Sequence, residues 1–189
     1  MTDAKGSCTR RSFLGASSVS LALATFASTG SVDAQIANAE KATSKMNISG
    51  MVHVNINCSD FDRSRTFYEF LGFRLTMMVP PRNTPEVAAA VGMPPYHVKG
   101  ALMSLPGSTT MIDLLEWKEP HDDSPPYPHL YHLGLGRIAL ATTDLDADVA
   151  TLKSRGVEFL SEPARVGPSR FVCFKDPDGT ILELVQMGA

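Results

Sequence analysis

Residues 53–62, HVNINCSDFD, decide the fold because their pattern returns as RIALATTDLD at residues 137–146, an offset of 84 positions (137 − 53). Each stretch is followed by a segment with helical spacing that ends at a glycine, Gly72 in the first copy and Gly156 in the second. Such self-similarity indicates two copies of one supersecondary unit. A site formed where the copies meet would take residues from both.

Each copy is expected to contain a strand, a helix and three further strands. Polar and apolar residues alternate from 51 to 57, which is typical of a half-buried strand, and a helix follows after Asp60. Strands are predicted at 73–79, 98–105 and 109–117, with a short helix near Pro85. The second copy is predicted to have strands at 137–143 and 157–160 and a hairpin over 169–185, so the fold class is α+β.

The two copies divide most of the chain. The first module is assigned to residues 50–117 and the second to 137–189. Between them, residues 118–136 are rich in proline and histidine and are read as a linker. The linker residues His129 and His132 are candidates to touch a ligand at the rim of a cavity, although a packed connector is the alternative interpretation.

Residues 1–34 are interpreted as a twin-arginine export signal. Arg10 and Arg11 precede an apolar run of small residues, and Ala34 ends a plausible cleavage site. Residues 35–49 would then form a polar leader, and the mature protein is expected to be periplasmic or secreted, without stable insertion in the membrane. After removal of Cys8 with the signal, Cys58 and Cys173 remain; Cys58 is expected to be a buried free thiol, and whether the two pair is left open.

The composition disfavours nucleic-acid binding. The 189 residues carry a formal charge of −3, with 43% hydrophobic and 20% charged residues, and no run of Lys and Arg interleaves with aromatic residues. The chain therefore has the composition of an ordinary globular protein.

Acidic residues within apolar strands are the candidate chemical groups. Asp113 lies in an aliphatic strand of the first copy and Glu183 in one of the second, while His53 begins the first strand. A carboxylate among aliphatic residues is costly to bury unless it is paired, protonated or bound to a cation. Imidazole and two carboxylates suit a divalent metal ion. The alternative is that both acids are solvent groups on edge strands.

With this pattern the chain resembles the vicinal oxygen chelate superfamily, which includes glyoxalase I, resistance proteins and extradiol dioxygenases. The resemblance covers residues 50–187 and is carried by 53–56, by 67–73, by 144–157 and by the closing segment 176–184. It implies two βαβββ modules whose mixed sheets curl around one cavity, often in a homodimer. It also implies a divalent metal ion (Fe, Mn, Ni or Zn) and a metal-dependent lyase, isomerase or dioxygenase that acts on a small oxygenated molecule.

The ligand positions of that superfamily carry over to His53, Asp113, Arg137 and Glu183. Asp113 replaces the usual glutamate. Arg137 stands where the superfamily has a histidine, and its guanidinium cannot ligate a metal ion as a histidine does. Three outcomes stay open. Water completes a site of His53, Asp113 and Glu183; His132 or His129 completes it; or no metal binds and Arg137 neutralises the carboxylates.

Roles follow for the same residues. Glu183 and His53 are expected to move protons, and Arg137 to clamp an anionic group. Substrate contacts are assigned to Arg137, Trp117, Asn55 and His132. The alternative function is a binding protein that sequesters a small molecule without turning it over, its metal site lost to Arg137.

Overall fold

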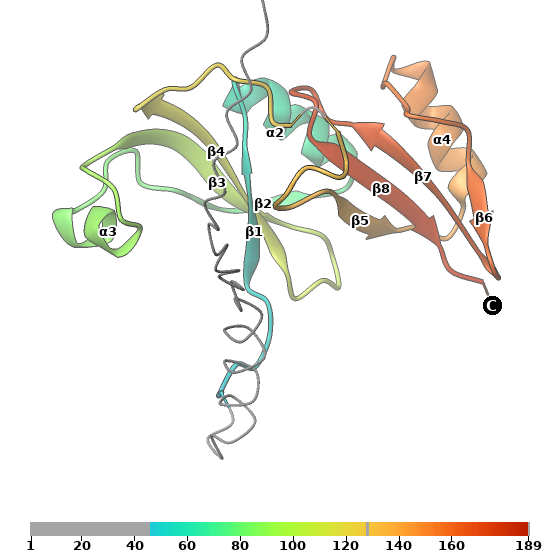
Figure 1. Cartoon of the computed structure of the whole chain (residues 1–189), viewed down its shortest axis with the longest axis horizontal. Helices are drawn as coiled ribbons and strands as arrows, with labels where there is room; N and C mark the ends of the chain where they lie inside the picture. The colour runs from blue at the N-terminus through green and yellow to red at the C-terminus, as the bar shows by residue number, and fades with distance from the viewer. Residues whose placement is uncertain (1–45, 128, 189) are drawn as a thin grey trace, which may run out of the picture. The chain divides into compact units, whose positions relative to one another are not determined.

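A computed structural model describes residues 46–127 and 129–188, so the predicted export signal at 1–34 lies outside the described residues (Figure 1). Residues 49–189 form one compact unit. It contains two four-stranded sheets with the orders β1-β4-β3-β2 and β5-β8-β7-β6. The predicted α+β fold with two βαβββ units is confirmed, and the two sheets are not joined into a closed barrel, since β1 and β5 are each an edge strand.

The first module begins with strand β1 (His53–Asn57) and helix α2 (Phe61–Phe70). Strand β2 (Arg74–Met78) and the short helix α3 (Pro85–Ala90) follow. Strands β3 (His97–Ser104) and β4 (Met111–Glu119) complete the module. The first and last strands are parallel neighbours, and Asn55 lies opposite Asp113.

The second module repeats this order. It consists of β5 (Ile138–Ala141), α4 (Leu145–Ser154), β6 (Ala164–Val166), β7 (Ser169–Lys175) and β8 (Ile181–Gln186). Strands β5 and β8 are parallel, with Ala139 opposite Glu183. The strand predicted at 157–160 is not formed: Phe159 makes one isolated bridge to Phe174, and the pairing with β7 resumes at β6, beyond Pro163.

Helices α2 and α4 begin and end in the same way. Asp60 caps α2 by accepting a hydrogen bond from the Arg63 backbone N–H, and Asp144 caps α4 by accepting one from Ala147. Gly72 and Gly156 follow the helices with φ angles of 98° and 76°. This left-handed conformation favours glycine and satisfies the last carbonyls of a helix.

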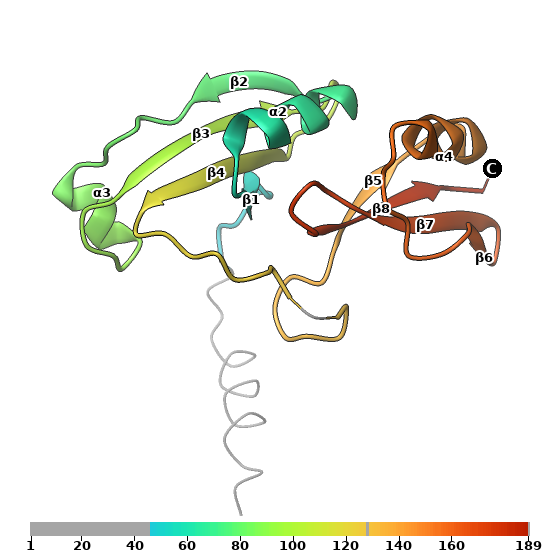
Figure 2. The ribbon, with the colours of Figure 1, turned by 90° about the horizontal axis from the view of Figure 1, so that it is seen from above.

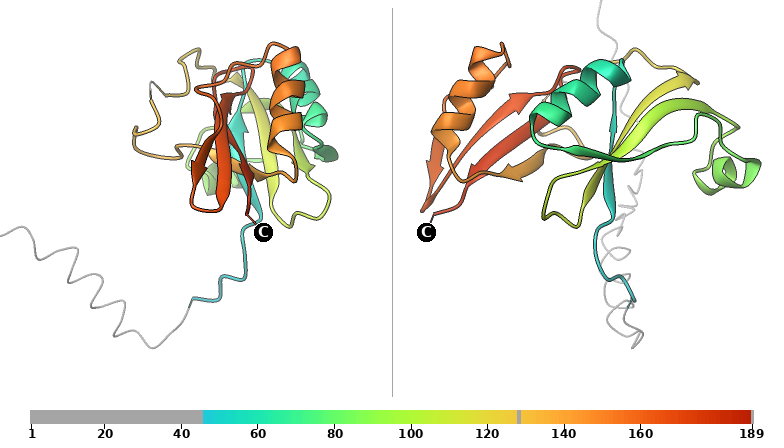
Figure 3. Two further views of the ribbon diagram at one scale, coloured as in Figure 1. Left: turned by 90° about the vertical axis from the view of Figure 1, so that its right-hand side faces the viewer. Right: turned by 180° about the vertical axis from the view of Figure 1, so that it is seen from behind.

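Helices α2 and α4 each cover one face of their own sheet (Figure 2). Buried residues of α2, such as Phe61 and Tyr68, pack with Ile112 and Leu114 of β4, and Leu145 and Val149 of α4 belong to the same apolar cluster. The view from behind shows α2 and α4 lying over strands of their sheets (Figure 3). The opposite faces of β1 and β4, which carry Asn55 and Trp117, are thereby left for a site. None of the helices in the described ranges is both long and apolar enough to cross a bilayer.

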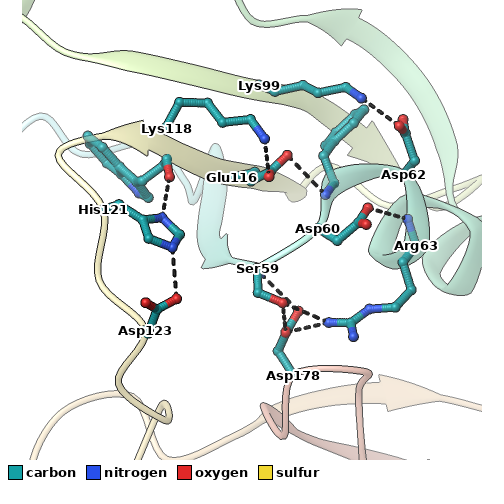
Figure 4. Close-up of polar contacts among 12 residues, drawn as sticks. Ser59, Asp60, Asp62, Arg63, Lys99, Glu116, Lys118, His121, Asp123 and Asp178 are labelled. Carbon is teal, nitrogen blue, oxygen red and sulfur yellow. Dashed lines mark hydrogen bonds and ion pairs between the residues drawn. The ribbon is translucent and has the colours of Figure 1, made fainter.

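The turn between β7 and β8 joins the second module to the first. Asp178 in this turn accepts hydrogen bonds from the Ser59 backbone N–H (3.2 Å) and the Ser59 hydroxyl (2.5 Å), at the start of α2. It also accepts one from the Arg63 guanidinium at 2.5 Å (Figure 4). A further hydrogen bond comes from the Ser64 hydroxyl at 3.2 Å. The positive end of a helix dipole favours a carboxylate at this position.

Asp176 provides a second contact from the same turn. It is 5% exposed and accepts a hydrogen bond at 2.9 Å from the hydroxyl of Tyr68, which is 1% exposed. Its other oxygen accepts from the backbone N–H groups of Asp178 and Thr180. Burial raises the pKa of Asp176, although these hydrogen bonds oppose the rise. We call Asp176, Asp178 and their partners Ser59, Arg63 and Tyr68 the carboxylate clamp.

Gly100→Ala tests the packing of β3 on β4. A Cβ atom at residue 100 would lie 2.4 Å from Leu115 Cδ2 and 2.5 Å from the Leu114 carbonyl oxygen. Because the backbone must move, we expect a loss of about 1–3 kcal/mol in the free energy of unfolding, measured by urea denaturation. Gly50→Ala is the control, since no atom lies within 4 Å of its Cβ position. Equal stability of the two variants would contradict the packing described.

Asp178→Asn tests the carboxylate clamp. Burial tends to raise the pKa of Asp178, but hydrogen bonds from Ser59 and Arg63 outweigh it and lower the pKa overall. The clamp therefore adds stability above the unfolded-state pKa, near 3.9, and this stability is lost as the pH falls through the lower folded-state pKa. We expect a loss of about 1–3 kcal/mol at pH ~7, since Arg63 is half-exposed and contributes less than Ser59.

The difference between wild type and Asp178→Asn should shrink when urea denaturation is repeated near pH ~3. Asp176 titrates in the opposite direction, because its folded-state pKa is raised; it is present in both proteins, and its contribution cancels apart from the small part of the rise that the Asp178 charge causes. Asp62→Asn, which removes an exposed ion pair with Lys99, should change stability little at either pH. A difference that stays constant between the two pH values would refute the role of the Asp178 charge.

Candidate functional site

An open cleft of about 990 Å³ lies among the described residues. It is bordered by the end of β1, by β4, by the linker and by the beginnings of β5 and β8. The four residues predicted from the sequence to touch substrate all line it: Asn55, Trp117, His132 and Arg137. The predicted proton-transfer and metal residues His53, Asp113 and Glu183 are not part of its wall.

Trp117 provides the largest aromatic surface of the cleft wall. Its indole N–H donates a hydrogen bond at 2.8 Å to the Asn57 side-chain oxygen on β1, and Tyr96 packs against it with 5.0 Å between ring centroids. Neighbouring Glu116 points to the helix side, where it accepts from the Phe61 backbone N–H and from Lys118, since side chains alternate along a strand. The indole ring is thus held in one orientation at the cleft.

Arg137 and Glu183 form an ion pair in the second module. The guanidinium Nε donates to a Glu183 oxygen, and Glu183 is 7% exposed whereas about half of the Arg137 side chain is exposed. This hydrogen bond and the nearby charge raise the pKa of Arg137 further. The buried carboxylate is therefore neutralised by a cation whose other end faces the cleft.

His53 and Asp113 are the corresponding groups of the first module. Burial raises the pKa of Asp113, and the neighbouring His53 opposes the rise. One carboxylate oxygen of Asp113 is buried and has no hydrogen-bond partner among the described residues. Of the four predicted side chains, the structure therefore bonds Arg137 to Glu183, whereas His53 acts on Asp113 through its charge alone.

The linker is tied to both modules along one side of the cleft. His121 lies between the Trp117 carbonyl and the Asp123 carboxylate, with both contacts at 2.8 Å (Figure 4). These hydrogen bonds raise the pKa of His121 because both partners are acceptors. Further along, the Tyr127 hydroxyl accepts a hydrogen bond at 2.9 Å from the Ile181 backbone N–H. The linker is therefore a structured part of the wall.

Comparison with known proteins identifies the family. The family model described as Glyoxalase/Bleomycin resistance protein/Dioxygenase superfamily matches residues 50–184. The chain belongs to this superfamily.

A relative in the superfamily is YwkD of Bacillus subtilis, an uncharacterized protein that is 30% identical over 138 residues, covering 71% of this chain and 94% of YwkD. A glyoxalase family protein from Bacillus cereus has a similar structure, with a TM-score of 0.64, 21% identity and coverage of 78% of this chain and 99% of that one. TnmS3 of Streptomyces sp. CB03234, an antibiotic-binding protein, has a TM-score of 0.55 and 27% identity, covering 76% and 100% of the two chains.

Superfamily members often use a divalent metal ion, and the side chains present decide whether one fits this chain. No group of three or more His, Cys, Asp or Glu side chains within the described ranges is close enough to hold a metal ion. The unpartnered oxygen of Asp113 beside His53 has the character of a ligand, but Glu183 is engaged by Arg137. The described residues therefore do not assemble the three-ligand set implied by the superfamily.

The two cysteines of the superfamily domain are free and buried. Cys58 lies on the helix side, and burial, the largest effect, raises the pKa of its thiol to about 12. The expectation of a buried free thiol at Cys58 is confirmed. Cys173 lies opposite Glu183 on β7, where burial also raises its pKa.

Sequence reasoning missed several residues of the cleft and clamp. Asp178 was noted only as part of a turn, and His121 and Asn57 were not assigned to a site. Asn57 shares the alternation of His53 and Asn55, and this signal could have identified it. The contacts of Asp178 and His121 depend on docking between distant segments, for which one sequence carries no local signal.

Arg137→Met tests the buried ion pair. It leaves the Glu183 carboxylate without its partner, and we expect a loss of about 1–3 kcal/mol in the free energy of unfolding. Glu183→Gln in the same chain should recover part of that loss, so that the urea-denaturation cycle shows a coupling of about 0.5–3 kcal/mol. Arg165→Met, at an exposed position of β6, is the control. Additive effects of the two substitutions would contradict the pairing.

Proposed function

We propose that this protein binds a small organic molecule in the cleft. The observation that carries the proposal is the combination of a volume of about 990 Å³ with a wall that joins the ring of Trp117 to polar groups of both modules. Ligand cavities of this size hold drug-sized molecules, with apolar surface for affinity and a few polar groups for orientation. TnmS3, a similar protein, is an antibiotic-binding protein, which agrees with this function.

The arrangement favours binding over a reaction at the superfamily's ligand positions. Arg137 neutralises Glu183 and occupies one of its two oxygens, which weakens this carboxylate as a base and as a metal ligand. His53 and Asp113 lie outside the cleft wall. Binding by the side chains of the cleft wall explains the cleft without a role for His53, Asp113 or Glu183. These wall side chains are Asn55, Trp117, His132 and Arg137.

Trp117 is the only tryptophan of the chain and reports on the cleft directly. We expect phenylnaphthylamine, an uncharged aromatic probe, to quench Trp117 fluorescence by energy transfer and to saturate at one equivalent. Asn55→Phe, which places a ring in the cleft, should weaken this binding at least about tenfold, whereas Ser161→Phe at an exposed position outside the cleft should not. Unsaturable quenching, or equal affinity in both variants, would refute binding in the cleft.

A metal-dependent lyase, isomerase or dioxygenase is the second candidate function. It is favoured by one observation, the buried Asp113 oxygen that lacks a partner beside His53. In this case the purified protein would retain Fe, Mn, Ni or Zn near one equivalent by elemental analysis, and Asp113→Asn would release it. Retention below about a tenth of an equivalent after growth with these metals would discard this candidate.

We further propose that the chain is exported. The proposal is supported by Arg10 and Arg11 ahead of the apolar run, within residues 1–34, which lie outside the described residues. A homodimer is the proposed assembly, supported by the exposure of linker side chains such as Leu133, which is 96% exposed.

A further inference from the structure

Arg137 has unused hydrogen-bond donors at the cleft. Its Nε atom donates to Glu183, and the described residues provide no other hydrogen-bond partner for its two terminal nitrogens. About half of the side chain is exposed, and the residue lines the cleft wall. A guanidinium that is held by one edge and free at the other is oriented to receive a second anionic group.

The other charged groups of the cleft wall already have partners. Asp178 is held in the carboxylate clamp, Asp123 accepts from His121, and Asp122 accepts from the Ser124 backbone N–H at 2.9 Å. Arg137 is the only Lys or Arg side chain in the wall as described. The unpaired hydrogen-bond donors of the cleft wall therefore lie on its Arg137 side, where Glu183 balances the guanidinium charge, whereas Asp122 on the linker side has no salt-bridge partner among the described residues and keeps its negative charge.

We propose that the ligand of this cleft is an organic anion, with an aromatic or apolar body against Trp117 and a carboxylate-like or sulfonate-like group at the terminal nitrogens of Arg137. The proposal rests on the proposed function, because it assigns the chemical class of the molecule bound there. Glu183 acts as a positioning residue: it fixes the guanidinium and does not touch the ligand.

Two probes with the same ring system separate this inference from the proposed function. Phenylnaphthylamine is uncharged, and anilinonaphthalene sulfonate carries an added sulfonate. Both are titrated against Trp117 fluorescence in the full mature chain. We expect the sulfonate to bind about tenfold more tightly than the uncharged probe, because one charge-assisted hydrogen bond supplies a difference in affinity of that size. The preference should fall when salt is raised, because the site is open to solvent.

The decisive variant is Arg137→Gln combined with Glu183→Gln. It removes the guanidinium, leaves no unpaired buried carboxylate and keeps the net charge of the chain. We expect it to bind both probes equally, with the affinity for phenylnaphthylamine unchanged. Arg137→Lys should also lose most of the preference, since its single nitrogen is needed by Glu183. Arg165→Gln, at an exposed arginine outside the cleft, should keep the full preference.

The outcomes are distinguishable. If neither probe quenches Trp117 saturably, the proposed binding function fails, and the inference fails with it. If both probes bind in the cleft with equal affinity in the wild type, or if the double variant keeps the preference for the sulfonate, binding stands and the anion assignment is overturned. Circular dichroism and urea denaturation of the double variant confirm that it is folded before the titrations are compared.

Discussion

The structure depends on the carboxylate clamp between the turn 176–179 and helix α2. The two sheets share no strand pairing, so their joining relies on packing between modules and on this polar contact. Asp178 meets the positive end of α2, and Asp176 is buried against the Tyr68 hydroxyl. A buried carboxylate is costly without partners, and the hydrogen bonds offset this cost only when the modules are docked. The clamp is therefore specific for one arrangement of the modules.

The clamp also places the cleft. Ser59 and Asp178 both belong to the cleft wall, and the Tyr127 hydroxyl binds the backbone of Ile181 two residues beyond the turn. The same short segment of the second module therefore holds α2 on one side and the linker on the other. The two copies differ in their side chains near this segment. At the start of the first strand, the first copy carries His53, whose charge acts on Asp113, and the second carries Arg137, which is bonded to Glu183.

Much of this was predictable from sequence because it depends on local periodicity. The strand alternation at 51–57, the aspartate caps and the glycines after both helices are local patterns, and they identified both modules. The pairing of Arg137 with Glu183 was among the alternatives considered. The failed strand at 157–160 shows the limit, since a short apolar run pairs only where its neighbour's register allows it. The clamp joins residues more than 100 positions apart, and such docking leaves no periodic trace.

The separation of the sheets has an evolutionary consequence. Because β1 and β5 are each free edges, a substitution at a polar position of one sheet does not disturb backbone pairing in the other. One half of a duplicated scaffold can thus carry a guanidinium while the other half carries an imidazole at the equivalent position. New ligand chemistry is then accessible through single replacements, without redesign of the shared core.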